Sequence, residues 1–254
     1  MHLYNQQGEP MYEISYRDPS KGMRKTTLAD AKKNGWVASV TSILLVLDKP
    51  GLNSWLQDRV LESALTLPRE KNESDKAYMT RVKQDSREIS TLARDEGTRI
   101  HDALEQSFTD RRVDPEYFEL TKNVQQKVYD YFQVSDGWIA EQSFSTISYG
   151  GKVDLYHPEK NIVIDFKTKE KFKYTKTGKI TKMAYDEHCM QLIAYACGLD
   201  IPTAQCINIF VEYSGEVVFH EWADDEVIRA WAMFNHCLEL WKLQKNYFPE
   251  KWGV

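Results

Sequence analysis

The sequence has no long hydrophobic run: no stretch approaches the roughly 18 consecutive apolar residues that a membrane-spanning helix requires. Its first residues, MHLYNQQGEP, also lack the charged segment followed by an apolar segment that marks a secretory signal. These two absences argue against a membrane partner, and we therefore expect a cytoplasmic protein.

Cysteines are few and widely spaced. The chain has four of them, and none forms a C-x-x-C pair: Cys189, Cys197, Cys206 and Cys237. Zinc and iron–sulfur sites usually draw their ligands from short cysteine loops. We therefore expect reduced, mostly buried thiols and no iron–sulfur cluster.

The chain also lacks an excess of basic residues. Its formal net charge is −5 over 254 residues, which argues against a protein that coats nucleic acid through its overall field. Net charge does not describe how charges are distributed, so a local basic patch is compatible with it. No Walker-type G-x-x-x-x-G-K-[ST] motif, internal repeat or low-complexity tract occurs, so any helicase motor would have to be another chain.

Apolar residues make up 42% of the chain and aromatic residues 12%, enough for the core of one large domain or of a domain with an added subdomain. Residues 1–38 are polar with scattered turn signals, and we expect an extended arm or small hairpin there. Residues 39–135 are rich in helix formers and predict a helical subdomain. Within it, residues 74–107 are read as one long helix or as two, because Gly97 interrupts the pattern.

Residues 136–254 have a different pattern, and we expect them to form the core with its C-terminal helix. Short apolar or alternating segments predict strands in the order β-β-β-α-β-β, followed by a helix from about residue 225 to residue 245. The predicted fold is α/β or α+β, with a small mixed central sheet of about five strands, flanking helices and an N-terminal helical subdomain or arch. We expect residues 39–254 to form one compact unit.

In the most β-prone segment, residues 150–171, three charged residues stand where a strand would present a buried face: Asp154, Asp165 and Lys167. Alternation along a strand places Asp165 and Lys167 on the same side, and a hairpin can bring Asp154 beside Asp165. Two neighbouring carboxylates repel each other, and a shared divalent cation relieves that repulsion. The pattern therefore suggests a Mg²⁺ or Mn²⁺ site completed by the main-chain carbonyl of Phe166.

A metal with an ammonium group beside it suits hydrolysis of a phosphodiester. The metal supplies a hydroxide-like nucleophile and stabilises the developing negative charge, while Lys167 orients the water, takes a proton or stabilises the phosphate. The plainer interpretation is that Asp154 lies at a strand end and that Asp165 and Lys167 form an exposed polar face.

Four short motifs occur in an order that resembles the PD-(D/E)xK nuclease superfamily, within it the RecB-type branch that includes phage exonucleases and the mitochondrial genome maintenance exonuclease. The motifs are GTRIH at 97–101, GKVD at 151–154, IDFKT at 164–168 and QLIAYACGL at 191–199. The likeness covers about residues 39 to 222. Each motif alone is weak, and the ordered set carries the resemblance.

This resemblance implies a role for several residues. His101 would bind the metal through a neutral ring nitrogen, together with Asp154 and Asp165, and Lys167 would act on the water. Without the resemblance, His101 would be read as a hydrogen-bonded helix histidine. The cysteines do not match the arrangement that holds an iron–sulfur cluster in some members of the branch.

Three further side chains are implied near the site. Gln191 and Tyr195 lie four residues apart on one helix face, and similar enzymes use such a pair to bridge the site and the nucleic-acid backbone. Their plain alternative is an ordinary contact between helix and sheet. In similar enzymes an acid at the position of Glu141 lies close to the metal ligands. The plain alternative is that Glu141 is an exposed acidic residue of a strand.

A lysine-rich segment follows the D-x-K strand directly. Residues 167–182 contain seven lysines and one acid, and we expect Lys169, Lys171 and Lys173 to contact phosphates and Tyr174 and Phe172 to stack on unpaired bases. A solvated flexible loop is the alternative. Another set of cations could form an opposite wall: Arg94, Arg99, Arg111 and Arg112.

The sequence therefore favours a metal-dependent deoxyribonuclease. The resemblance implies a DNA exonuclease that acts at free or single-stranded ends, in repair, recombination or phage DNA processing in a bacterial or phage-infected cell. DNA is the expected partner, and a helicase, single-strand-binding or recombination protein is a compatible one. Two alternatives remain: a structure-specific endonuclease or resolvase on the same core, and a catalytically silent nucleic-acid-binding protein.

Overall fold

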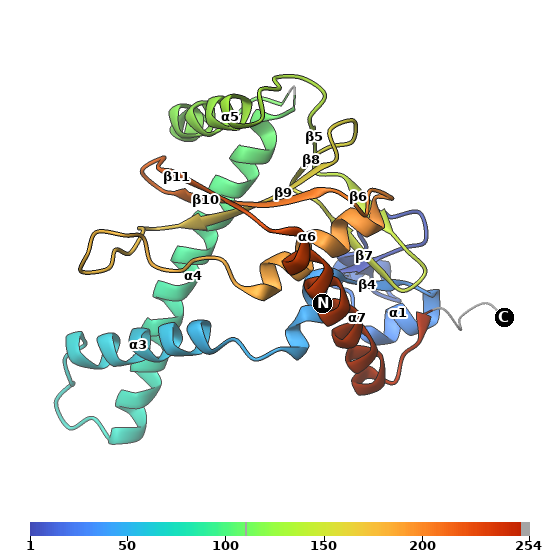
Figure 1. Ribbon diagram of the computed structural model, residues 1–254. Helices are drawn as coiled ribbons and strands as arrows, with labels where there is room; N and C mark the ends of the chain where they lie inside the picture. The colour runs from blue at the N-terminus through green and yellow to red at the C-terminus, as the bar shows by residue number, and fades with distance from the viewer. Residues whose placement is uncertain (110, 250–254) are drawn as a thin grey trace. The chain divides into compact units, whose positions relative to one another are not determined.

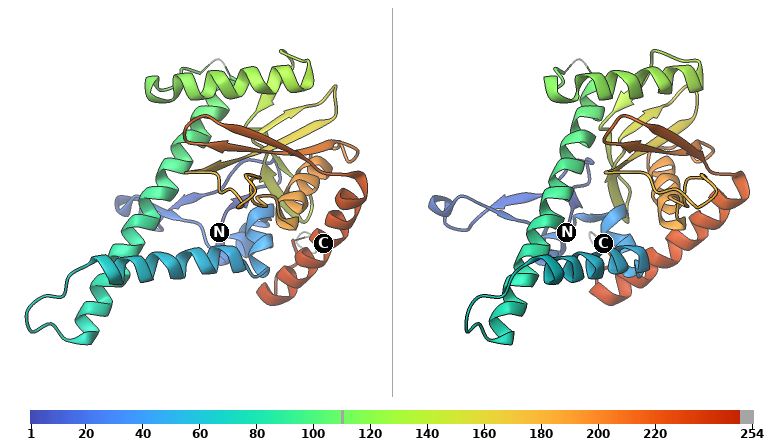
Figure 2. Two further views of the ribbon diagram at one scale, coloured as in Figure 1. Left: turned by 60° about the vertical axis from the view of Figure 1, so that its left-hand side comes forward. Right: turned by 90° about the vertical axis from the view of Figure 1, so that its left-hand side faces the viewer.

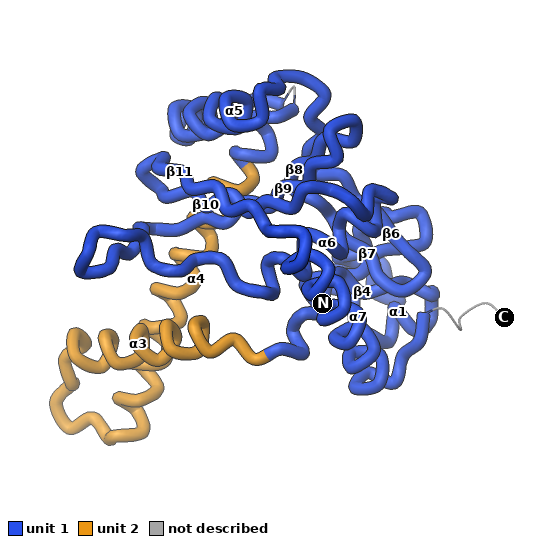
Figure 3. Tube along the Cα trace, in the orientation of Figure 1, with its two compact units in different colours: residues 1–47, 103–254 blue, residues 48–102 orange. Residues whose placement is uncertain are grey.

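The protein is a mixed α/β protein in the computed structural model, which describes residues 1–109 and 111–249 (Figure 1). It divides into two compact units (Figure 3): residues 1–47 with residues 103–254, and residues 48–102. The sequence predicted boundaries at residues 38 and 135.

The larger unit is built around a five-stranded sheet with the strand order β11-β10-β9-β8-β5. Its centre is a parallel pair, β9 (Ile162–Lys169) and β10 (Gln205–Glu212). The other strands pair antiparallel: β5 (Ile139–Ala140), β8 (Leu155–His157) and β11 (Val217–Glu221). The prediction of a small mixed sheet of about five strands is confirmed.

Helices cover both faces of this sheet (Figure 1 and Figure 2). Helix α6 (Asp186–Gly198) packs on β9 and β10, and α7 (Asp224–Lys245) packs on α6. Helix α5 (Phe118–Phe132) lies on the other face, where the ring of Tyr131 stacks on Phe219 with centroids 4.4 Å apart. The apolar face of α7 is buried at three positions and half-buried at the fourth: Phe234, Leu238, Trp241 and Trp231.

A second sheet of the larger unit has the order β1-β4-β7-β6. Its strands are β1 (Leu3–Tyr4), β4 (Val37–Ser39), β6 (Ser143–Ser145) and β7 (Tyr149–Lys152). The N-terminal residues thus pair with the strands of the core rather than forming only an arm, and Leu3 is fully buried.

Residues 1–38 also contain the hairpin expected from the sequence. Strands β2 (Glu13–Ser15) and β3 (Met23–Lys25) pair antiparallel, joined by a 3-10 turn at Pro19–Lys21. Helix α1 (Leu28–Asn34) follows, and Thr27 and Asp30 form its capping box.

Ser39 caps a short helix. The Ser39 hydroxyl accepts a hydrogen bond from the Ser42 amide at 3.0 Å, and α2 (Val40–Ile43) continues as a 3-10 turn over Leu44–Val46. Asp114 likewise caps the 3-10 turn Pro115–Tyr117 that leads into α5.

One long hairpin joins the two sheets. Its arms are residues 139–145 and 149–157: the outer part pairs as β6 with β7, and the inner part pairs as β5 with β8. Between these parts each arm leaves the strand conformation for two residues, at 141–142 and at 153–154. The Glu141 amide still donates to the Asp154 carbonyl at 3.1 Å, so the arms stay in register where the chain passes from one sheet to the other.

The smaller unit consists of α3 (Pro50–Thr66) and the greater part of α4 (Asp75–Ser107). The Tyr78 hydroxyl donates to the carbonyls of Ala64 and Leu67 at 2.7 and 3.1 Å, which fastens the two helices near their connection. Helix α4 runs through Gly97 without a break, because one glycine costs a helix only about 1 kcal/mol.

No helix in the described part of the chain is both long enough and apolar enough to cross a membrane. All four cysteines are free, and three of them are buried.

The contact between Gly198 and Phe144 gives a prediction for stability. A Cβ atom at Gly198, in the last turn of α6, would overlap the buried Phe144 ring. Gly198→Ala should therefore lower the free energy of unfolding by about 1–3 kcal/mol, measured by urea denaturation. Gly51→Ala is the control, because nothing lies within 4 Å of the added atom and the site is helical. Equal stability of the two variants would contradict this packing.

Candidate active site

Asp165 on β9 is the centre of a buried polar cluster. Its side chain is 2% exposed. Lys167 Nζ lies 2.7 Å from Oδ2 and 2.9 Å from Oδ1, Gln191 Nε2 donates to Oδ1 at 2.7 Å, and Asn208 Nδ2 donates to Oδ2 at 2.7 Å. The expected proximity of Asp165 and Lys167 is therefore confirmed, and two amides complete the arrangement.

Three elements deliver these side chains to one point. Alternation along β9 places Asp165 and Lys167 on the face that α6 covers. Gln191 lies in the second turn of α6. The parallel register of β9 and β10 places Asn208 directly beside Asp165.

Asn208 and Trp222 are residues that the sequence reasoning missed. The Trp222 indole N–H donates to Asn208 Oδ1 at 2.8 Å. Because an indole can only donate, it fixes the orientation of the amide, so that Nδ2 faces the carboxylate. The available signal was a lone asparagine inside the apolar run CINIFV, where a buried amide needs partners.

Gln191 connects the cluster to Tyr195. Its amide nitrogen also approaches the Tyr195 hydroxyl at 3.0 Å, and its oxygen accepts from Lys167 at 3.2 Å. Tyr195 is 4% exposed. Burial raises the pKa of Tyr195 well above its usual value, and the charges of Asp154 and Asp165 raise it further. Tyr195 is therefore a neutral phenol that supports Gln191 from inside the protein.

Tyr195 also explains the glycine of the GKVD segment. A Cβ atom at Gly151 would lie 2.8 Å from Tyr195 Cε1 and 2.9 Å from the Phe144 ring. A residue without a side chain is needed there for β7 to pass so close to α6.

The sequence predicted that Asp154 lies inside a strand. In the structure Asp154 instead occupies the break between β7 and β8. The reason is that its chain changes from one sheet to the other at that point. Asp154 is nevertheless buried, and its Oδ2 accepts a hydrogen bond from the Phe166 amide at 2.8 Å. The N–H and C=O groups of a strand residue point to the same side, so the Phe166 carbonyl is directed toward the edge that Asp154 covers.

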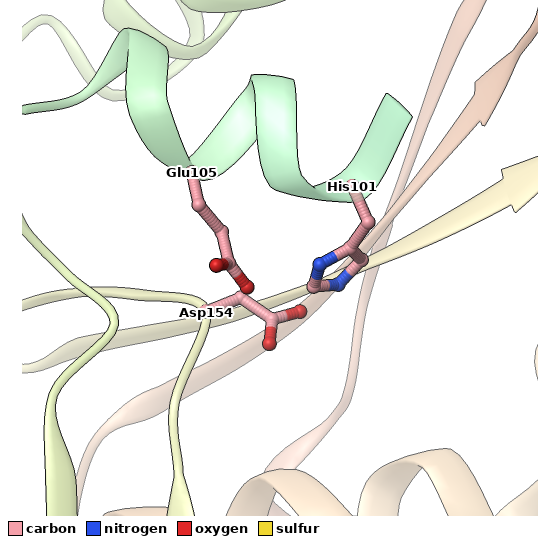
Figure 4. A group of neighbouring side chains, drawn as sticks. All are labelled: His101, Glu105 and Asp154. Atoms are coloured by element: carbon pink, nitrogen blue, oxygen red, sulfur yellow. The ribbon is translucent and has the colours of Figure 1, made fainter. Parts of the chain in front are cut away.

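Asp154 forms a second acidic group with His101 and Glu105 (Figure 4). Glu105 follows His101 by four residues on α4, and both side chains point toward Asp154. One potential ligand atom from each residue lies within 4.8 Å of the others. Among the described residues this is the one such group found, and Asp165 is not a member. Glu105 is 3% exposed, and the sequence analysis missed it although the spacing of four residues was visible.

Glu141 lies in the hairpin break opposite Asp154. Its backbone has a φ of 58°, the left-handed conformation that costs a non-glycine residue energy. Its carboxylate accepts from Lys152 Nζ at 2.7 Å and from Arg111 Nη1 at 2.6 Å. Hydrogen bonding to Glu105, together with these two cations, lowers the pKa of Glu141 to about 2. Lys152 is also 3.5 Å from Glu105, so Glu141 belongs to the surroundings of the acidic group.

The lysine-rich segment 169–182 leaves β9 and forms an irregular loop with one β-bridge, Tyr174 to Ile180. The expectation that Phe172 stacks on bases is wrong, because its side chain is 2% exposed and belongs to the core. Tyr174 is half-exposed, and Lys171 and Lys173 are exposed. Burial, and then the charges of Lys167 and Lys173, lower the pKa of Lys169.

Arg94 and Arg99 lie on α4 in the smaller unit. Each pairs with a nearby acid: Arg94 with Asp95 at 2.9 Å, and Arg99 with Glu96 at 3.1 Å. Both arginine side chains are more than half exposed.

The larger unit thus presents a mixed α/β core with buried acids, an ammonium group and carboxamides beside the middle of its central strands. Comparison with protein-family models finds none that matches the chain, and comparison with curated proteins finds no match.

Glu141 gives a prediction for pH dependence. Its pKa falls from 4.5 to about 2 on folding, so its contribution to stability is present above about pH 4.5 and is lost as the pH falls toward 2. Glu141→Gln should therefore reduce stability most at neutral pH, and the difference from the unchanged protein should shrink below pH 4. Urea unfolding measured between pH 3 and pH 7 checks this, and a difference that is independent of pH would contradict it.

Proposed function

We propose that the protein is a metal-dependent deoxyribonuclease that hydrolyses phosphodiester bonds, acting as an exonuclease at free or single-stranded ends. The observation that carries the proposal is the pairing of two acidic centres. Asp165 with Lys167 lies on β9. Asp154 directly precedes the Leu155–Ile164 pair of β8 and β9 and lies with Glu105 and His101. The ordered motifs that resemble the PD-(D/E)xK nucleases support the same conclusion.

The ligand atoms suit a hard divalent cation. Carboxylate and carbonyl oxygens are the groups that Mg²⁺ and Mn²⁺ prefer, and an imidazole nitrogen is tolerated by Mn²⁺. Glu105, Asp154 and His101 would hold the ion, with the Phe166 carbonyl directed toward the same edge and Asp165 as a further ligand. The bound ion would supply a Lewis acid for the phosphate and lower the pKa of a bound water.

Lys167 is the residue that we assign to the attacking water or to the phosphate oxygens. The Lys167 side chain is 26% exposed, so it is held by Asp165 and still reaches solvent. Gln191 Oε1 accepts a hydrogen bond from the Lys167 ammonium group at 3.2 Å. A positioned proton-transfer group accelerates a reaction by about 10²–10⁴-fold. We expect Lys167 to accelerate phosphodiester hydrolysis by a factor in this range.

The substrate contacts would come from the loop after β9. Lys171 and Lys173 are exposed and follow the site directly in the chain, and phosphate contacts by such lysines do not depend on base sequence. Tyr174 adds an exposed ring on which a base can stack. These contacts would allow the strand to move, as an exonuclease requires.

Replacement of Asp154 and Lys167 tests the proposed chemistry. Asp154→Asn should abolish cleavage, because a neutral ligand weakens the cation site while its oxygen still accepts from the Phe166 amide. Lys167→Ala should reduce turnover by about 10²–10⁴-fold. The measurement is digestion of end-labelled single- and double-stranded DNA with and without Mg²⁺ or Mn²⁺.

Lys160→Ala, an exposed turn lysine, is the matched control and should cleave normally. Near-normal cleavage by Asp154→Asn would remove the proposed mechanism. Cutting of covalently closed circles as fast as linear strands would favour an endonuclease, and metal-dependent binding without any product would favour a silent nucleic-acid-binding protein.

Metal binding gives a second prediction that does not depend on catalysis. A ligand at one hundred times its dissociation constant stabilises a folded protein by about 2.7 kcal/mol, so Mn²⁺ should raise the thermal unfolding temperature. Glu105→Gln should lose most of this shift, whereas Glu221→Gln, an exposed acid on β11, should keep it. Equal shifts in both variants would place the ion elsewhere.

A further inference from the structure

A cavity of about 730 Å³ lies where the last turn of α4 gives way to the segment that leads into α5. Ser107 of α4 and Phe118 and Lys122 of α5 line it, together with Arg111 and Arg112 from the connecting segment. Its volume is sufficient for a nucleotide-sized group.

The wall of this cavity is cationic and carries an aromatic ring. Arg111, Arg112 and Lys122 contribute three positive charges, and none of its described lining residues is acidic. Phe118 is 51% exposed, although an aromatic side chain is usually buried. Positive side chains beside an exposed ring are the equipment with which proteins hold unpaired nucleic acid: the cations contact phosphates and the ring stacks on a base.

A chain of ion pairs connects the cavity to the acidic group. Arg111, in the cavity wall, donates to Glu141 at 2.6 Å, and Glu141 accepts from Lys152, which lies 3.5 Å from Glu105. The cavity is therefore linked to Glu105 through Glu141 and Lys152.

We propose that this cavity binds unpaired nucleotides of a DNA strand, next to the nucleotide whose phosphate is attacked. Arg112 and Lys122 contact the backbone, and Phe118 stacks on a base. Arg111, which is already engaged by Glu141, couples occupancy of the cavity to the acidic group. The assignment of the strand to a cleaved substrate rests on the proposed function, whereas binding itself does not.

Charge removal in the full-length chain tests the proposal. Binding of a fluorescein-labelled single-stranded 12-mer is measured by anisotropy at several salt concentrations without divalent metal. The double substitution Arg112→Ala with Lys122→Ala should weaken binding about tenfold or more and reduce the slope of log Kd against log salt by about one per cation removed. Lys33→Ala with Lys160→Ala, also exposed residues of the larger unit, removes the same charge and should change Kd less than twofold.

Photo-crosslinking locates the strand independently of affinity. The 12-mer carries a single 5-iodouracil at successive positions from its end, and crosslinked peptides are identified by mass spectrometry. We expect a crosslink at Phe118 from a position within a few nucleotides of one end. Phe118→Leu should lose it, with the circular dichroism spectrum of the protein unchanged.

The outcomes separate the two proposals. Normal cleavage with unchanged binding by the Arg112 and Lys122 double variant, and no crosslink at Phe118, would overturn the assignment of this cavity and leave the nuclease proposal intact. A crosslink at Phe118 with weakened binding, but no cleavage under any metal condition, would support the binding site and remove the proposed nuclease activity. An equal loss of binding in both double variants would show an effect of net charge alone and would also overturn the assignment.

Discussion

The buried charge of Asp165 is the constraint on which this end of the molecule depends. An ionised carboxylate away from water is costly unless hydrogen bonds and an opposite charge compensate it. Here Lys167 supplies the charge, and Gln191 and Asn208 supply two amide donors. Their elements, β9, α6 and β10, can satisfy the carboxylate only in one relative position, so the electrostatic requirement and the packing of the sheet support each other.

The junction of the two sheets imposes a second constraint. Both arms of the hairpin leave the strand conformation at the same level, one at Glu141 and the other at Asp154. Glu141 takes a left-handed backbone conformation there. Such strain persists where the surrounding structure determines it. The result is that two acidic side chains from facing positions reach Glu105, Lys152 and Phe166, which a continuous pair of strands would not achieve.

Local patterns in the sequence were sufficient for the five-stranded sheet, the long helices and the proximity of Asp165 and Lys167, because strand alternation and helix periodicity act over a few residues. They failed where long-range geometry decides. Asp154 looked like a strand residue because nothing in the letters GKVD marks a change of sheet. Phe172 looked like an exposed ring because its neighbours are lysines. Asn208 acquires its role only through the parallel register with β9, which the sequence does not specify.

The saturation of Asp165 bears on how the proposed enzyme would work. A carboxylate offers about four lone-pair positions, and the contacts from Lys167, Gln191 and Asn208 already approach both oxygens twice. The Asn208 amide is held by the Trp222 indole N–H. If the amide turned away from Asp165, that N–H would lose its hydrogen-bond acceptor. Lys167 is the flexible member, and it has a second acceptor in Gln191 Oε1. Ligation of a cation by Asp165 would therefore displace the ammonium group rather than the amides, and the displaced Lys167 would remain beside Gln191, within reach of the water or phosphate on which we propose it acts.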